Sequence, residues 1–121
     1  FDAFAELRAA LETARVRERR PDALTAAQAL TMMTLEGARA LGLEDETGSI
    51  VPNKWADLVV VSLEGSPFDP VEDPVAAVVL GGSPDRVVAT LVAGEERYRK
   101  GRTEWRDSTS RGRSARSRML R

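Results

Sequence analysis

Residues 48–63 separate a helix-like part of the chain from a strand-like part, and this division sets the fold class. Pro52 and Asn53 suit the second and third positions of a type II turn, because proline presets φ and asparagine tolerates the left-handed conformation. After Asp57, residues 58–61 are apolar and mostly β-branched, which predicts a strand buried on both faces. We therefore expect a short strand, a tight turn and a longer strand here. The fold class predicted is α+β, with N-terminal helices followed by mostly antiparallel strands.

Three helices are predicted before this stretch, and the first two precede Thr34. Residues 1–20 form an amphipathic pattern that ends at Pro21, since the residue before a proline avoids the α region. Its apolar stripe contains Phe4, Leu7, Leu11 and Ala14. Thr25 and Gln28 then have the spacing of a capping box, which predicts a second helix. We expect that helix to bury Ala26, Ala29, Leu30 and Met33.

A third, short helix is predicted over residues 35–41. Thr34 is a candidate N-cap that would break the second helix and start this one. Gly42 suits the position just after a helix C-terminus, and Leu43 can make the accompanying hydrophobic contact.

The rest of the chain predicts loop and strand. Three prolines in residues 64–74 exclude regular structure. Residues 75–80 are an apolar run and predict a buried strand, and residues 86–92 predict a strand with alternating faces. Ala93 and Gly94 form a tight turn into a last strand over residues 95–100. About five strands are expected, and their unpaired edges favour association with another chain segment or self-association as a homo-oligomer.

Composition limits the chemistry that this chain can perform. The chain has 121 residues, 42% hydrophobic and 31% charged, which is typical of one soluble globular domain. No apolar run approaches the roughly 20 residues that span a bilayer, and the first residues lack a basic signal-peptide region. The sequence contains neither cysteine nor histidine. Disulfides and Ser-His-Asp triads are thereby excluded within the chain, and a cytoplasmic location is expected.

Charge is distributed unevenly along the sequence. Residues 97–121 carry ten basic and two acidic residues, whereas residues 1–96 carry eight basic and seventeen acidic ones. Residues 103–121 are predicted to form a flexible basic tail. Nucleic-acid binding is disfavoured because no aromatic residue follows Trp105 and no binding fold precedes the tail. A first residue other than methionine predicts that the N-terminus arose by processing, cloning or fragmentation.

Several polar residues are candidates for chemistry, and each has a simpler structural explanation. Lys54 lies in the predicted turn, and Asp57 is expected to accept backbone hydrogen bonds at the strand entry. Gly81 and Gly82 precede a proline and a strand, so they make a poor phosphate loop. Clustered carboxylates are expected to lie in loops or at a hairpin turn: Glu44, Asp45 and Glu46; Asp69, Glu72 and Asp73; Glu95 and Glu96. No set of residues supplies a nucleophile, a base and oxyanion donors together.

Taken in order, several motifs resemble the C-terminal part of the metal-dependent amidohydrolase superfamily, in the branch with chlorohydrolases, cytosine deaminase and adenosine-derivative deaminases. The resemblance covers about residues 1–101. The similar segments are Asp2, Phe4, Glu6, Leu7 and Arg8; residues 24–30 and 36–43; Gly48, Ser49, Ile50, Pro52 and Lys54; residues 56–60; Asp73 and Pro74; and residues 92–94. Asn53 and Trp55 depart from the family pattern, which usually has glycine and a basic or small residue there.

The resemblance implies a (β/α)₈ barrel with a small composite β-sandwich built from both chain ends. It implies one or two divalent metal ions, zinc or iron, and a metal-bound hydroxide that attacks a carbon–nitrogen or carbon–chlorine bond. The last metal-binding aspartate of the family would lie upstream of Phe1, so no catalytic or metal-binding residue carries over to this chain, and its substrate contacts are unknown. Residues 1–45 would be closing helices of the barrel, residues 46–102 part of the sandwich, and residues 103–121 the tail.

Two hypotheses of different classes follow from the sequence. The first is that the chain is the structural C-terminal segment of a hydrolase acting on non-peptide carbon–nitrogen bonds, with the barrel and N-terminal sandwich strands as its partner. The second is a stand-alone α+β interaction module whose basic tail binds an acidic partner. The edges of the sheet discriminate between them, because a free-standing module should protect its own edges.

Overall fold

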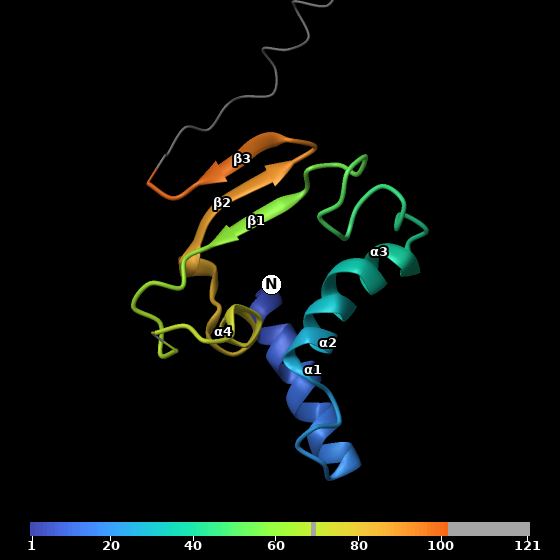
Figure 1. The fold of residues 1–121 in the computed structure, drawn as a ribbon, viewed down its shortest axis with the longest axis vertical. Helices are drawn as coiled ribbons and strands as arrows, with labels where there is room; N and C mark the ends of the chain where they lie inside the picture. The colour runs from blue at the N-terminus through green and yellow to red at the C-terminus, as the bar shows by residue number, and fades with distance from the viewer. Residues whose placement is uncertain (69, 102–121) are drawn as a thin grey trace, which may run out of the picture.

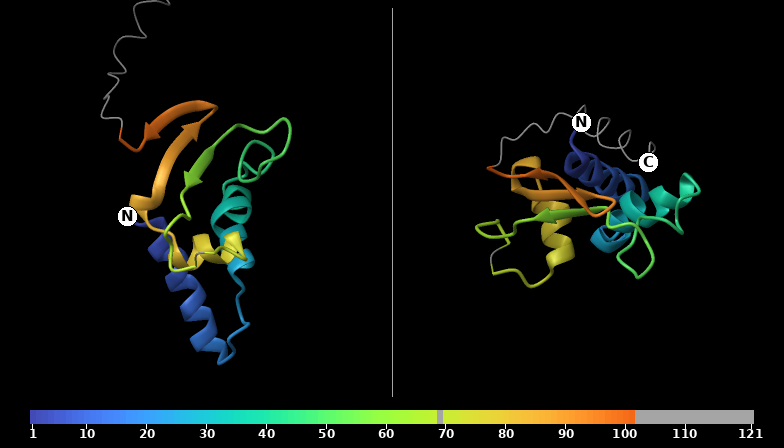
Figure 2. Two further views of the ribbon diagram at one scale, coloured as in Figure 1. Left: turned by 60° about the vertical axis from the view of Figure 1, so that its left-hand side comes forward. Right: turned by 90° about the horizontal axis from the view of Figure 1, so that it is seen from above.

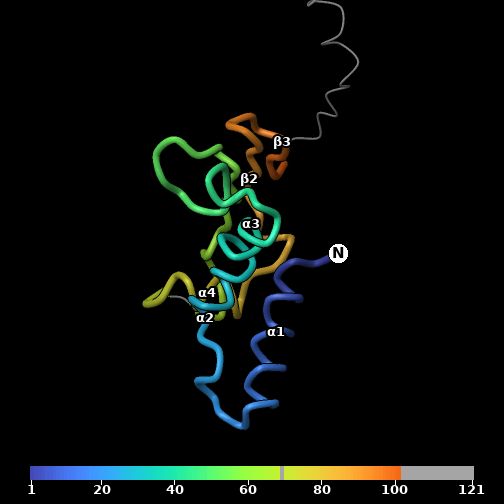
Figure 3. The backbone as a smooth tube through the Cα atoms, turned by 90° about the vertical axis from the view of Figure 1, so that its right-hand side faces the viewer, coloured from blue at the N-terminus to red at the C-terminus, as the bar shows by residue number. Residues whose placement is uncertain are grey.

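The computed structural model describes residues 1–68 and 70–101, and it confirms an α+β fold with N-terminal helices and antiparallel strands, although helical residues also lie between the first two strands. The first helices are α1 (Ala3–Glu18), α2 (Ala26–Thr31), the π-helix η1 (Met32–Glu36) and α3 (Gly37–Ala40). They are followed by β1 (Leu58–Val61), α4 (Pro74–Gly81), the 3₁₀-helix η2 (Pro84–Arg86), β2 (Val87–Val92) and β3 (Glu95–Arg99). The three strands occupy one end of the molecule, and α1 extends away from them (Figures 1 and 3).

Helix ends form where the sequence provides capping groups. The carboxylate of Asp2 accepts hydrogen bonds from the backbone N–H groups of Phe4 and Ala5, at 2.9 and 3.1 Å, and starts α1. The predicted capping box of Thr25 and Gln28 is present at the start of α2. Gly42 has φ +69° after α3, and the N–H of Leu43 donates to the carbonyl of Ala38. These contacts satisfy backbone groups that a helix end leaves unpaired.

The second and third helices are continuous through the π-turn, so the predicted break at Thr34 is wrong. The Thr34 hydroxyl donates to the carbonyl of Leu30 instead of capping a new helix. Met33, expected to be buried, is exposed, because the wider π-turn changes the direction of the side chains that follow it.

Residues 75–80 belong to helix α4, and the predicted strand is wrong. Asp73 accepts hydrogen bonds from the N–H groups of Val75 and Ala76, and Pro74 occupies the first helical turn. An aspartate N-cap followed by proline is a strong helix start, and here it outweighs the β-branched residues of the run. Figure 2 shows α4 below the strands, near the N-terminal half of α1.

The sheet has three strands in the order β1-β2-β3, both pairs antiparallel. The expected short strand before Pro52 is absent, which with α4 accounts for the difference from the predicted five. The predicted turns are confirmed at Asn53, with φ +70°, and at Ala93 and Gly94, which both have positive φ. Such a two-residue turn matches the twist of a hairpin.

The buried core lies among the helices and leaves the sheet thinly covered. Leu7 and Leu11 of α1 pack with Ala29 of α2 and Val79 of α4. Among the described residues of the three strands, only Ala89 is fully buried. The helical part therefore contains the hydrophobic centre, and the sheet projects from it with much of its surface accessible. No helix in residues 1–68 and 70–101 is long and apolar enough to cross a membrane.

Candidate docking surface

The strand β1 is a free edge of the sheet with apolar side chains on both of its faces. Val59 is 58% exposed and Val60 is 47% exposed, and successive side chains of a strand point to opposite faces. The prediction that residues 58–61 are buried on both faces is wrong for the described chain, because Val59 and Val60 are exposed. The second edge of β1 also has no partner strand among the described residues. A strand of this composition is normally covered.

The other edge of the sheet has the opposite character. Four of the five residues of β3 are charged: Glu95, Glu96, Arg97 and Arg99. Arg97 pairs with Glu95 at 3.1 Å, and Arg99 pairs with Glu96. The hydrogen bonds that Arg99 donates to the Glu96 carboxylate raise the pKa of Arg99. Charged residues on an edge strand discourage pairing with a further strand.

Apolar exposure extends beyond β1 to the loop that leads into it. Ile50 is 87% exposed and Trp55 is 57% exposed on either side of the turn at Pro52 and Asn53. Large exposed apolar residues also occur on the helices and at the hairpin: Phe1, Val16, Met32, Met33, Leu41, Leu43, Leu80, Val92 and Tyr98. The exposed apolar residues of β1 and of the loop before it, Ile50, Trp55, Val59 and Val60, mark a candidate surface for contact with other protein.

Lys54 holds this loop against residues 44–47, and Asp57 holds it against the hairpin. The Lys54 ammonium group donates hydrogen bonds to the carbonyl oxygens of Glu44 and Thr47, so its role in the described chain is to stabilise the loop. Asp57 accepts a hydrogen bond from the N–H of Ala93 at 2.7 Å and another from the Thr47 hydroxyl at 2.9 Å. The expectation that Asp57 accepts backbone hydrogen bonds is confirmed. The hydrogen-bond acceptors of Lys54 could not be predicted from the sequence, because they are backbone carbonyl groups, which every residue has.

The glycine pair at the C-terminal end of α4, Gly81 and Gly82, is a packing site. Gly82 is buried, and a Cβ there would overlap the ring of Phe4 and the carbonyl of Val78. Its carbonyl accepts a hydrogen bond from Arg8 at 2.7 Å. Gly82 joins α4 to α1 in this way, whereas Gly81 packs against Phe68, and the backbone that follows enters a 3₁₀-turn.

The clustered carboxylates do not converge on a metal site. Asp73 caps α4, and Asp69 lies outside the described residues. The Ser83 hydroxyl lowers the pKa of Asp85 by donating a hydrogen bond to its carboxylate. Within residues 1–68 and 70–101, no group of three or more carboxylates is placed to hold an ion.

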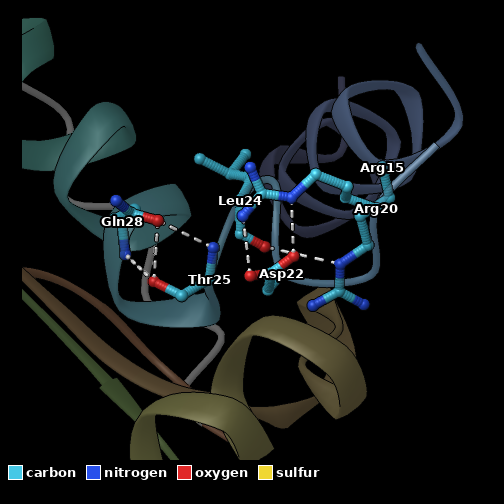
Figure 4. A network of polar contacts seen from close by, with 6 residues as sticks. All are labelled: Arg15, Arg20, Asp22, Leu24, Thr25 and Gln28. Atoms are coloured by element: carbon cyan, nitrogen blue, oxygen red, sulfur yellow. Dashed lines mark hydrogen bonds and ion pairs between the residues drawn. The ribbon is translucent and has the colours of Figure 1, made fainter. Parts of the chain in front are cut away.

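Polar contacts close the loop between α1 and α2 (Figure 4). Arg20 forms a two-point contact with Asp22, at 2.9 and 3.1 Å, which lowers the pKa of Asp22. Arg15 reaches the carbonyl of Leu24 at 3.4 Å. A groove of about 750 Å³ runs beside this loop, with alanines of α1 on its wall and charges of both signs around it. These contacts fix the helical hairpin, and they do not assemble a reactive group.

Comparison with known proteins identifies the family. The sequence model of the amidohydrolase family matches residues 1–97. This chain therefore belongs to the amidohydrolase family, and the resemblance found in its motifs is confirmed. The described part of the chain is an α+β segment with a three-stranded antiparallel sheet.

Relatives in this family are considerably longer than this chain. It is 38% identical over 96 residues to a 5-methylthioadenosine/S-adenosylhomocysteine deaminase of Teredinibacter turnerae, covering 79% of this chain and 22% of that protein. It is 42% identical over 70 residues to a 5'-deoxyadenosine deaminase of Methanobrevibacter smithii, covering 58% of this chain and 16% of that one. The chain thus spans about a fifth of the length of the curated relatives it matches.

Two solved structures of deaminases are similar to this chain in three dimensions. An adenosine deaminase from Xanthomonas campestris with bound zinc superposes with a TM-score of 0.80 at 32% identity, over 94% of this chain and 26% of that protein. Guanine deaminase from E. coli superposes with a TM-score of 0.67 at 28% identity, over 78% and 23% of the two chains.

Proposed function

We propose that this chain is the C-terminal segment of a metal-dependent amidohydrolase and that its own role is structural. The observation that carries this proposal is the family match over residues 1–97 in a chain that covers only 22% of a relative. Residues 1–45 would close the barrel, residues 46–102 would complete a composite sandwich, and residues 103–121 would form a basic tail. The open edge and exposed apolar residues of the described chain support this role, since they need a covering partner.

The reaction proposed for the whole enzyme is hydrolytic deamination. The relatives named above are deaminases of adenosine derivatives, of adenosine and of guanine. In such a reaction water adds to the carbon that bears the amino group, the carbon–nitrogen bond breaks, and ammonia leaves. The product carries oxygen in place of nitrogen. An adenosine-type compound is the substrate class that the similarity favours.

The residues of this chain do not fit a catalytic metal centre. The sequence has no histidine or cysteine, and the described residues contain no carboxylate cluster able to bind an ion. The bound zinc of the Xanthomonas campestris relative supports a divalent metal in the whole enzyme. Its ligands would come from the part of the enzyme outside this chain.

The partner proposed for the segment is the remainder of the same enzyme. A cytoplasmic location is proposed from the absence of cysteine. The alternative, a stand-alone interaction module, gains no support from the comparisons. It also conflicts with an unprotected apolar edge at β1, which an independent domain would normally avoid.

An activity assay on the enzyme that carries these residues tests the proposal. Ammonia release is measured with 5-methylthioadenosine, S-adenosylhomocysteine, 5'-deoxyadenosine, adenosine and guanine, before and after removal of metal by a chelator. We expect release from at least one adenosine-type compound, loss after chelation, and recovery when zinc or iron is returned. Absence of ammonia from every compound in the metal-loaded enzyme would contradict the proposed reaction.

A further inference from the structure

We propose that Val51 and Trp55, on the loop that leads into β1, form the centre of a contact between two copies of the enzyme that carries this segment. The contact would be twofold, so that the loop of one copy meets the same loop of the other. This inference goes beyond the proposed function and concerns a surface other than the strand edges. It is carried by the fixed conformation of the loop, by the exposure of its apolar side chains, and by the distribution of charge around them.

Backbone hydrogen bonds within the described chain fix the conformation of this loop. The N–H of Lys54 donates to the carbonyl of Val51 at 3.4 Å and closes the turn over residues 51–54. The N–H of Trp55 donates to the carbonyl of Glu46 at 2.8 Å, and the backbone that follows is bonded to the turn between β2 and β3 (Figure 1). The loop is therefore ordered before any partner binds, which lowers the entropy cost of association.

Large apolar side chains are exposed on both sides of the turn. Val51 is 51% exposed before it and Trp55 is 57% exposed after it, and Ile50 extends the same apolar stretch. Tryptophan is enriched among the residues that dominate binding energy at protein interfaces, and a half-exposed indole leaves a large apolar area to bury. A fixed loop with these side chains is thus suited to contact with protein.

The identity of residue 55 argues against the rest of the enzyme as the group that covers it. Trp55 departs from the family pattern, in which this position is usually basic or small. A basic side chain is almost never fully buried unless it is paired, so this position is expected to face water in complete family members. The partner of Trp55 is therefore expected to lie outside the enzyme subunit that carries it.

The distribution of charge favours a second copy as that partner. Near a twofold axis each residue lies close to its own equivalent, so a charged residue there would meet a like charge. Between residues 48 and 56 the only charged residue is Lys54, and its ammonium group donates to the carbonyls of Glu44 and Thr47 in the same chain. Residues 1–96 carry seventeen acidic and eight basic residues, so contacts elsewhere on the segment generally bring like charges together. The loop lets two copies meet without that repulsion at the centre of the contact.

Sedimentation velocity of the metal-loaded enzyme over a range of concentrations tests the proposal by measuring the dissociation constant between copies. Trp55→Arg places a charge at the proposed axis, and the fold should tolerate it because a basic residue is usual at this position in the family. We expect this substitution to raise the dissociation constant at least about thirtyfold, which is the threshold for a residue that dominates an interface. The matched control is Val16→Arg, at a residue that is 78% exposed on α1, and it should change the constant by less than about threefold.

A second substitution keeps the test decisive if Trp55→Arg does not fold. Val51→Arg adds the same charge on the other side of the turn, and it should also raise the dissociation constant. In both variants the metal content and the rate of ammonia release per subunit should match those of the unaltered enzyme, because neither residue belongs to the metal centre. A constant that is unchanged in the folded variants would overturn the proposal.

Other outcomes separate this inference from its alternatives. Equal weakening by Val16→Arg would show a general effect of charge, and would overturn the proposal. A lower melting temperature of Trp55→Arg in an enzyme that is monomeric at every concentration would assign Trp55 to a contact within one subunit, and would also overturn it. An active, metal-loaded deaminase that is monomeric would refute the contact and leave the proposed function intact. A protein that associates through this loop but has neither metal nor deaminase activity would instead refute the proposed function and support the contact.

Discussion

Substitution of Gly48 by alanine tests how the loop leading to β1 is held against the helices. Gly48 has φ +86°, a region that residues with a side chain rarely adopt. A Cβ at this position would lie 2.7 Å from the Cβ of Ala38 and 3.0 Å from the carbonyl oxygen of Thr34. The π-turn and α3 therefore leave space for the backbone of the loop and for no side chain.

The expected loss of stability has two parts. The left-handed backbone costs about 1–2 kcal/mol for alanine. Overpacking against the backbone of the helix adds about 1–3 kcal/mol, because the contacting groups are main-chain atoms and a buried Cβ that cannot rotate away. Gly48→Ala should thus lower the free energy of unfolding by about 2–5 kcal/mol.

The matched control is Gly42→Ala. Gly42 has φ +69° but no atom within 4 Å of its hypothetical Cβ, so it carries the backbone cost alone. Denaturant unfolding of both variants, followed by circular dichroism, measures the difference between them. A Gly48 variant that loses no more stability than the Gly42 variant would refute the steric part of this reasoning.

Three further substitutions test other parts of the structure. Leu11 is 1% exposed, and Leu11→Ala should lower the free energy of unfolding, measured with denaturant, by about 2–5 kcal/mol. Val16 is exposed, and Val16→Ala should change that free energy by no more than about 0.5 kcal/mol. Equal effects of the two substitutions would show that Leu11 is not part of the core. Thr25→Ala removes the cap of α2 and should cost about 1 kcal/mol, with Thr13→Ala on the exposed face of α1 as a near-neutral control. Ser83→Ala should raise the pKa of Asp85 toward its usual value, as measured by NMR titration of the carboxyl carbon, and an unchanged pKa would show that the hydroxyl is not its cause. Because the folded-state pKa is lowered, the stabilisation from Asp85 is present above the unfolded-state pKa of about 3.9 and is lost as pH falls through the folded-state value.

Local helix and turn signals were predictable because they depend on neighbouring residues. The capping box of Thr25 and Gln28 and the positive φ of Asn53 each follow from the side chain at that position. At α4, two local signals disagreed: the valines favoured a strand, and Asp73 with Pro74 favoured a helix. The cap determined the outcome, and contacts with α1 and α2 that no sequence window contains hold the helix in place.

Features that depend on distant contacts could not be predicted. The backbone of η1 and α3 lies close to Gly48, which is outside the helix, and Met33 is exposed where a regular helical pattern predicted burial. The exposure of Val59 and Val60 was missed for a different reason. Their apolar pattern is typical of a strand that is covered by other protein. In the described chain, β1 pairs only with β2, and these two valines are left uncovered. The docking surface is visible only when the sequence pattern and the structure are compared.

The central claim, that this chain is part of a larger metalloenzyme, is tested most directly by intact mass together with metal analysis of the same sample. The sample is the protein that carries this sequence, purified from cells that produce it. We predict a mass about four to five times the 13.2 kDa of this chain, in proportion to the 22% of a relative that it spans, with zinc or iron bound in stoichiometric amount. A protein of 13.2 kDa without metal would contradict the account.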